Sequence, residues 1–164
     1  MLTQREIEEK AYDILEMVEM ENRSNIDIIA LARRYGFTVK NAQFAKEDII
    51  TIVKIVNHDK IIYVKKNLPN KAKRILISRA FSKYMLKQNE FIVCYKDSDI
   101  DSERLARALL MRKEIFSKIV YMSTYIGKPL YLMEKELANI FNTTRNEAKY
   151  RMLELRKASI TLPK

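Results

Sequence analysis

Apolar residues recur at helical spacing through most of this chain, beginning close to its N-terminus. Thr3 and Glu6 are typical of a capping box, in which each side chain accepts a hydrogen bond from the other residue's backbone at the start of a helix. Apolar positions with a helical period then follow at Ile7, Ala11, Ile14 and Val18. A second stripe, which stops at Gly36, consists of Ile28, Leu31, Ala32 and Tyr35. The pattern therefore predicts two helices before Phe37.

The middle of the chain changes to runs of β-branched residues. Ile49–Val56 and Ile61–Val64 are two such runs, and the polar residues Asn57–Lys60 separate them. Because β-branched side chains favour strands, we expect an antiparallel hairpin here. Phe91–Tyr95 is a further short apolar run that predicts another strand. Between these elements Pro69 favours the start of a helix, which we extend to about Gln88.

The remainder of the chain returns to helical spacing. We expect one helix from about Asp101 to Met111, another to about Tyr125, and two more after the helix-breaking residues Gly127 and Pro129. The predicted fold class is α+β, dominated by helices, with a small antiparallel sheet and a C-terminal pair of helices that resembles a helix-turn-helix. We expect residues 1–126 to form one domain and residues 127–164 to form the helix pair packed on it.

Composition narrows the classes of function. The net charge of +10 favours acidic partners, nucleic acid first among them, although the lysines are spread over the whole chain, as in many basic proteins without such a role. The single cysteine, Cys94, cannot form an internal disulfide, which suits a reducing compartment. No apolar stretch approaches the roughly 20 residues needed to span a bilayer. We therefore expect a cytoplasmic protein with no membrane association.

Residues that could carry catalysis are scarce. The only histidine, His58, lies in the predicted hairpin turn, so a nucleophilic pair with Cys94 would have to be assembled from two different elements. Two isolated glycines cannot form a glycine-rich phosphate loop, and no group of His and Cys residues has the spacing of a metal site. The sequence therefore predicts a protein with no cofactor and no enzymatic activity.

Four segments, taken in order, carry a resemblance to a known family. They read IDIIALARRYGFTV at 26–39, RILISRAFSKYML at 74–86, DSERLARALLM at 101–111 and ELANIFNTTRNEAKYRMLEL at 136–155. With the hairpin between the first two, the chain is similar over nearly its whole length to the ImmA/IrrE family of zinc peptidases, which is associated with mobile elements and stress regulators. The resemblance implies a zincin-like fold and a partner such as a helix-turn-helix repressor, which active members of the family inactivate.

The zinc-binding residues of that family are replaced in this chain. Aligned from Arg74, the two histidines of the family's His-Glu-x-x-His motif fall on Arg79 and Lys83, and its catalytic glutamate falls on Ala80. Neither an arginine nor a protonated lysine offers a lone pair to a metal, and alanine cannot act as a base. The family's third ligand, a glutamate, falls on Asp101. The resemblance therefore implies a pseudopeptidase, in which Arg79 or Lys83 pairs with Asp101 where zinc would lie, or in which all three are solvated charges.

The C-terminal helix pair offers a second candidate surface. Thr144 and Glu147 form another capping-box pair directly after a tight polar turn. On the last helix Arg145, Lys149 and Arg156 share one face, which could contact phosphates or base edges, or could belong to a helix pair that only packs or binds a partner. Nearby tyrosines and methionines could form an exposed recognition surface or fill the core: Tyr121, Tyr125, Tyr131, Met111, Met122 and Met133.

Two hypotheses of function follow from these features. The first is a catalytically inactive ImmA/IrrE-like regulator of a phage or other mobile element, which binds a transcriptional repressor or related regulator without cutting it. The second is a regulator that binds DNA directly through the basic C-terminal helix pair. Binding to DNA would weaken steeply as salt rises, whereas a protein interface with an apolar centre would respond far less.

Overall fold

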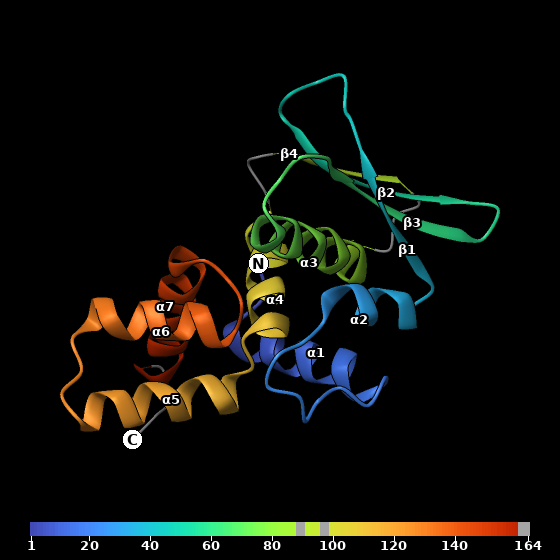
Figure 1. The fold of residues 1–164 in the computed structure, drawn as a ribbon. Coiled ribbons are helices and arrows are strands. Elements are labelled where there is room, and N and C mark those ends of the chain that lie inside the picture. Colours follow the sequence, from blue (N-terminus) through green and yellow to red (C-terminus); the bar gives the residue numbers. More distant parts are fainter. Residues whose placement is uncertain (88–90, 96–98, 161–164) are drawn as a thin grey trace. The chain divides into compact units, whose positions relative to one another are not determined.

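A computed structural model of the chain describes residues 1–87, 91–95 and 99–160, and shows an α+β fold that is mostly helical with a small sheet (Figure 1). Its helices are α1 (Gln4–Glu16), α2 (Ile28–Arg34), α3 (Asn70–Lys87), α4 (Ile100–Leu110), α5 (Lys113–Tyr125), α6 (Leu130–Ile140) and α7 (Arg145–Ile160). Its strands are β1 (Phe37–Ala42), β2 (Ile49–Val56), β3 (Asp59–Lys65) and β4 (Phe91–Tyr95). Every helix and strand expected above is present, and β1 is an additional strand. Gln88, the expected end of α3, lies outside the described residues.

The chain forms two compact units. The sheet unit comprises residues 27–106, and the helical unit comprises residues 1–26 and 107–164. These units differ from the boundary expected after residue 126, because α1 contacts α7 and the two ends of the chain therefore share one unit. No helix in the described parts of the chain is long and apolar enough to cross a membrane.

The sheet of the sheet unit is mixed, with the strand order β1-β3-β2-β4. The predicted hairpin is confirmed, since β2 and β3 pair antiparallel with Val53 opposite Ile62, and β4 adds to β2 antiparallel. The prediction of a purely antiparallel sheet is wrong, because β1 pairs with β3 in parallel. The chain reverses direction after β1, so β2 is antiparallel to β1. It reverses again in the hairpin, so β3 is parallel to β1.

Helix α3 contacts β2, β3 and β4 of the sheet (Figure 1). Its Phe81 is 0% exposed, and the Phe81 ring meets the rings of Tyr35 and Phe37 edge-on at centroid distances of 5.4 Å and 5.9 Å. Aromatic pairs prefer such edge-to-face contacts, which add to the burial of their apolar area. This packing fixes the rotation of α3 about its axis and with it the directions in which Arg79 and Lys83 leave the helix.

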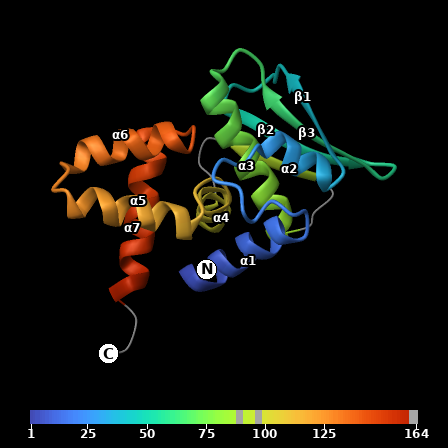
Figure 2. The same ribbon diagram turned by 60° about the horizontal axis from the view of Figure 1, so that its bottom comes forward.

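The helical unit begins with the predicted capping box. The Thr3 N–H donates to Glu6 Oε2 at 2.6 Å, and the Glu6 N–H donates to Thr3 Oγ1 at 3.2 Å. At the other end of the chain, Figure 2 shows α5, α6 and α7 joined by short turns. The turn before α7 contains Asn142 in the left-handed conformation, with φ of 48°, and Thr144 Oγ1 accepts from the Glu147 N–H at 3.4 Å. The predicted helix pair is therefore present, and one of the two hydrogen bonds of the capping box predicted for α7 is formed.

Candidate functional site

The three positions predicted to replace a zinc motif, Arg79, Ala80 and Lys83, lie on α3 of the sheet unit. Ala80 is 0% exposed, so this residue belongs to the buried face of the helix. Arg79 and Lys83, one helical turn apart, are both half-buried. Arg79 Nη1 lies 3.2 Å from Glu103 Oε1 of α4, and the two side chains are only 19% and 25% exposed. An ion pair therefore joins α3 to α4 at Arg79.

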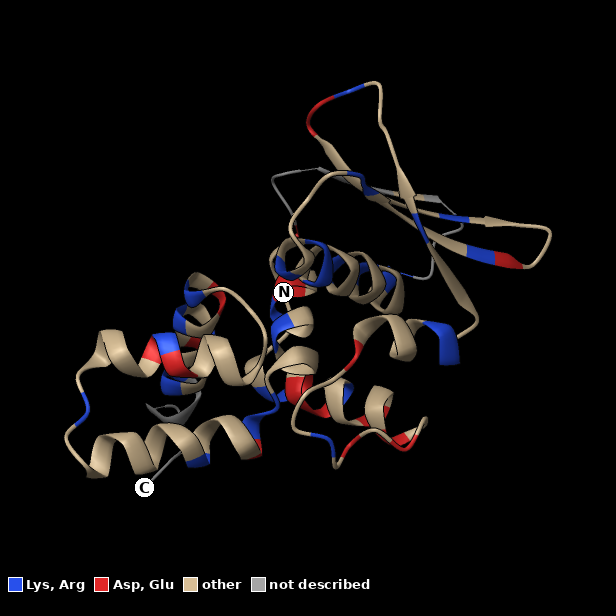
Figure 3. Cartoon of the chain, in the orientation of Figure 1, with Lys and Arg blue, Asp and Glu red and all other residues tan. Residues whose placement is uncertain are grey.

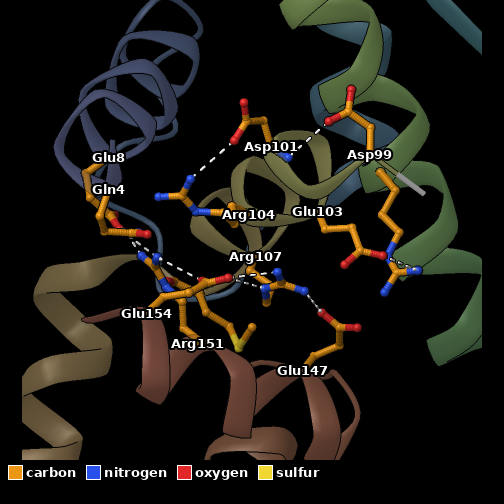
Figure 4. A network of polar contacts seen from close by, with 12 residues as sticks. Gln4, Glu8, Asp99, Asp101, Glu103, Arg104, Arg107, Glu147, Arg151 and Glu154 are labelled. Carbon is orange, nitrogen blue, oxygen red and sulfur yellow. Dashed lines mark hydrogen bonds and ion pairs between the residues drawn. The ribbon is translucent and has the colours of Figure 1, made fainter. Parts of the chain in front are cut away.

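Asp101, the position predicted for the third ligand, also lies at the start of α4. Its Oδ1 accepts from Arg104 Nη1 of the same helix at 3.2 Å, as Figure 4 shows. Glu103, two residues further along α4, pairs with Arg79. Since two residues turn a helix by about 200°, Asp101 and Glu103 leave α4 in nearly opposite directions.

A second ion pair lies at the end of α3. Lys87 Nζ is 2.8 Å from Asp99 Oδ2, and Asp99 Oδ1 accepts from the Asp101 N–H at 3.1 Å at the start of α4. The hydrogen bond and charge of Lys87 lower the pKa of the Asp99 carboxyl, against a smaller opposing effect of burial. Asp99 is thus a carboxylate that both caps α4 and pairs with α3.

Two cations of α3, Arg79 and Lys87, therefore pair with acids at the start of α4. Among the described residues, no group of three or more His, Cys, Asp or Glu side chains is placed to hold a metal ion. Burial lowers the pKa of the Arg74 guanidinium, while the charge of Asp27 acts in the opposite direction.

The remaining catalytic candidates are His58 and Cys94. His58 is exposed in the turn between β2 and β3, in the left-handed conformation with φ of 73°. Asn57 before it has φ of 49°, so both residues of this two-residue turn have the positive φ that tight hairpins require. The conformation of His58 is thus explained by the hairpin itself. The side chain of Cys94 lies outside those that the structure describes.

The chain matches no protein-family model, and no curated protein is similar to it in sequence.

The three basic residues predicted as a binding face of α7 differ in their surroundings. Arg145 Nε donates to Glu134 Oε2 of α6 at 2.6 Å, and the Glu134 side chain is only 5% exposed. The charge of Arg145 is therefore balanced by a buried carboxylate. Lys149 and Arg156 are exposed, and both line a groove of about 490 Å³ between α5, α6 and α7.

The groove is otherwise mostly apolar. Each of the three helices contributes side chains to its lining, among them Phe116, Val120, Tyr121, Leu130, Met133 and Leu153. Phe116 and Met133 are almost fully buried, at 0% and 4% exposure, whereas Tyr121 and Leu153 are 69% and 44% exposed. The groove thus has a buried apolar floor and exposed apolar sides.

Exposed apolar side chains continue outside the groove along α5 and α6. Tyr125, Ile126 and Tyr131 are 79%, 66% and 57% exposed. No charged residue lies between Lys118 and Lys128, and the last part of α5 is tan, without blue or red, in Figure 3. We call this surface and the groove together the apolar face.

The exposed fractions decide whether the tyrosines and methionines form a surface or fill the core. The three tyrosines and Met122 are exposed, so they form a surface, whereas Met111 and Met133 are buried at 0% and 4% exposure and fill the core. Sequence reasoning missed Glu103 and Glu134 as partners of Arg79 and Arg145. No signal in the sequence identified these two partners. Each contact joins two helices, and which residues meet depends on the rotation that packing gives to each helix.

Proposed function

We propose that this chain is a regulatory protein that acts by binding another protein and does not hydrolyse peptides. The observation that carries the proposal is the apolar face, which exposes three tyrosines beside a groove. Large apolar side chains that gather in the open on a protein surface often mark a binding site. Tyrosine is also enriched in protein interfaces, because it combines a large apolar ring with a polar end.

The chemistry at Arg79, Ala80 and Lys83 supports the absence of peptidase activity. A zinc site needs neutral donor atoms with lone pairs, and a metal-bound water needs a nearby base. Arg79 is engaged with Glu103 instead, and Ala80 is buried and cannot accept a proton. The resemblance to ImmA/IrrE peptidases then favours a pseudopeptidase of a mobile element, with a transcriptional repressor or a related regulator as its partner.

Such a protein would act by shifting an equilibrium of its partner. When a protein binds a partner that has two states, the shift between those states is limited by the difference between its affinities for them. Contact with a repressor in its DNA-free state would therefore lower the fraction bound to DNA without cleavage of the chain.

Direct DNA binding is the second candidate function. Lys149 and Arg156 favour it, since both are exposed on α7, the second helix of the helix-turn-helix-like pair. Two observations weigh against DNA binding. The charge of Arg145 is balanced by Glu134, and apolar side chains surround Lys149 and Arg156. A phosphate backbone is bound by cations and polar groups and gains nothing from an apolar lining.

We expect the untagged chain, produced with zinc in the growth medium, to carry far less than one zinc ion per chain. The reason is that two of the family's ligands are cations here. Elemental mass spectrometry of the purified protein measures the ratio. Stoichiometric zinc, together with peptide hydrolysis that a chelator abolishes, would overturn the proposal that the chain is not a peptidase.

We also expect a photo-crosslinking amino acid at Tyr125 to capture a discrete protein in the cells that normally produce this chain. Tyr125 is 79% exposed and lies on the apolar face outside the groove lining. The same amino acid at Tyr12 of α1, which is 45% exposed, is the matched control and should give no such adduct. Adducts are identified by gel shift and mass spectrometry. A nuclease-sensitive adduct without a protein partner would favour DNA binding instead.

A further inference from the structure

We propose that the groove between α5, α6 and α7 binds an amphipathic helix of the partner protein, whose apolar stripe enters the groove and whose carboxylates pair with Lys149 and Arg156. This inference rests on the proposed function and adds the place of contact and the chemistry of the partner.

The shape of the groove fits side chains of a helix. Its volume of about 490 Å³ is that of a typical ligand pocket, and its floor consists of the buried Phe116 and Met133. Exposed side chains of α5 and α7, Tyr121 and Leu153, stand beside this floor. An amphipathic helix that lays its apolar face into a groove between helices is a recurring mode of recognition, with anchors at every third or fourth residue.

The extent of the apolar face favours a protein segment over a small molecule. Tyr125, Ile126 and Tyr131 lie outside the groove lining and are each more than half exposed, at 79%, 66% and 57%. A small molecule seated in the groove would leave these side chains in water. A helix of about 14 residues is about 21 Å long, and flanking parts of its protein can cover the rest of the face.

Charge decides the chemistry of the partner. Lys149 and Arg156 are exposed cations in the groove lining, and among the described residues that line it the only acid is Glu134. Glu134 is 4% exposed and its carboxylate accepts from Arg145, so it contributes little negative potential to the groove. The groove therefore presents apolar surface beside net positive charge, which complements an apolar stripe with Asp or Glu at its edge.

The positions of the two cations predict a spacing. Lys149 and Arg156 are seven residues apart on α7, which corresponds to two turns and about 10 Å along the helix axis. A partner helix lying along α7 would meet both cations with two acids that are also seven residues apart. Those acids would flank apolar residues at i, i+3 or i+4, and i+7.

The test uses the full-length chain and a fluorescein-labelled helical peptide of about 14 residues. The probe peptide carries leucines at helical spacing and two glutamates seven residues apart. One control peptide has lysines in place of the glutamates, and another has serines in place of the leucines. We expect saturable binding of the probe peptide by fluorescence anisotropy, and binding of both controls weaker by about tenfold or more.

Variants of the chain locate the contact. We expect Leu153→Asp and, independently, Lys149→Glu to weaken binding of the probe peptide by about tenfold or more. Leu132→Asp is the matched control, since Leu132 is 40% exposed against 44% for Leu153 but lies outside this groove's lining, and it should leave binding unchanged. Circular dichroism of each variant checks that its helices are intact.

Several outcomes overturn the inference. They are equal binding of the lysine or serine peptide, binding that neither Leu153→Asp nor Lys149→Glu weakens, and no binding of any peptide. A concentration-dependent dimer that Leu153→Asp disrupts would assign the groove to a second copy of this chain and overturn it too. If the peptides fail while Tyr125 still captures a protein in cells, the inference is wrong and the proposed function stands.

Discussion

Replacing Arg151 by methionine lowers the free energy of unfolding by about 3–5 kcal/mol, because it breaks a buried ion pair by removing one partner. The Arg151 side chain is 0% exposed, and its two terminal nitrogens donate to the carboxylate of Glu8 at 2.6 Å and 2.7 Å. Its Nε donates to the Met111 carbonyl at 2.9 Å. Figure 4 shows Arg151 between Glu8 of α1 and Glu154 of its own helix. Methionine would leave the Glu8 carboxylate partly buried without this cation.

The control for Arg151 lies on the same helix as Glu8. Arg5 Nε and Glu9 Oε1 are also 2.7 Å apart, but their side chains are 88% and 58% exposed. Exposed pairs contribute little, since water screens them, so Arg5→Ala should leave the unfolding midpoint almost unchanged. Denaturant unfolding followed by circular dichroism measures both variants. Equal effects of Arg151→Met and Arg5→Ala would show that the Glu8–Arg151 pair is not buried in solution.

A second change tests whether the loss comes from the uncompensated charge. When both members of a buried pair are replaced by apolar residues of similar size, stability is often largely restored. Glu8→Leu combined with Arg151→Met should therefore be more stable than Arg151→Met alone. A double variant that is less stable than the single one would mean that the two positions contribute separately.

The local elements of the fold could be read from the sequence because their signals are local. The capping box of Thr3 and Glu6 involves two residues one turn apart, and both of its hydrogen bonds form. The hairpin of β2 and β3 is set by two β-branched runs and a short turn. The strand β1 was missed because Lys40 and Asn41 are both exposed and polar, so its apolar pattern ends after Val39.

The contacts between distant residues could not be read in this way. Arg145, Arg151 and Arg156 lie on one helix and look alike as sequence, yet Arg151 is fully buried against Glu8, which lies 143 residues earlier. Likewise the sequence resemblance leads us to predict that Arg79 replaces a zinc ligand, but nothing in the sequence indicates that it meets Glu103. Burial of a charged side chain depends on what the rest of the chain packs against it, and no periodicity in the helix itself records that.

Replacing Phe81 by alanine lowers the free energy of unfolding by about 3–5 kcal/mol, the usual cost of removing a fully buried aromatic ring. Phe81 is 0% exposed and its ring contacts those of Tyr35 and Phe37. Phe81→Leu keeps much of the apolar volume and should cost distinctly less, which separates the loss of packing from a general intolerance of substitution.

The Phe81 variants also test how the Arg79–Glu103 ion pair is held in place. Phe81 lies two residues after Arg79 on α3, and its packing sets the rotation of that helix against α2 and β1. If the Arg79–Glu103 pair depends on this rotation, Glu103→Gln should lower the free energy of unfolding less in the Phe81→Ala variant than in the unchanged chain. Denaturant unfolding of the four proteins in this double-mutant cycle measures the coupling. Strictly additive losses would mean that the ion pair forms independently of the core beneath it.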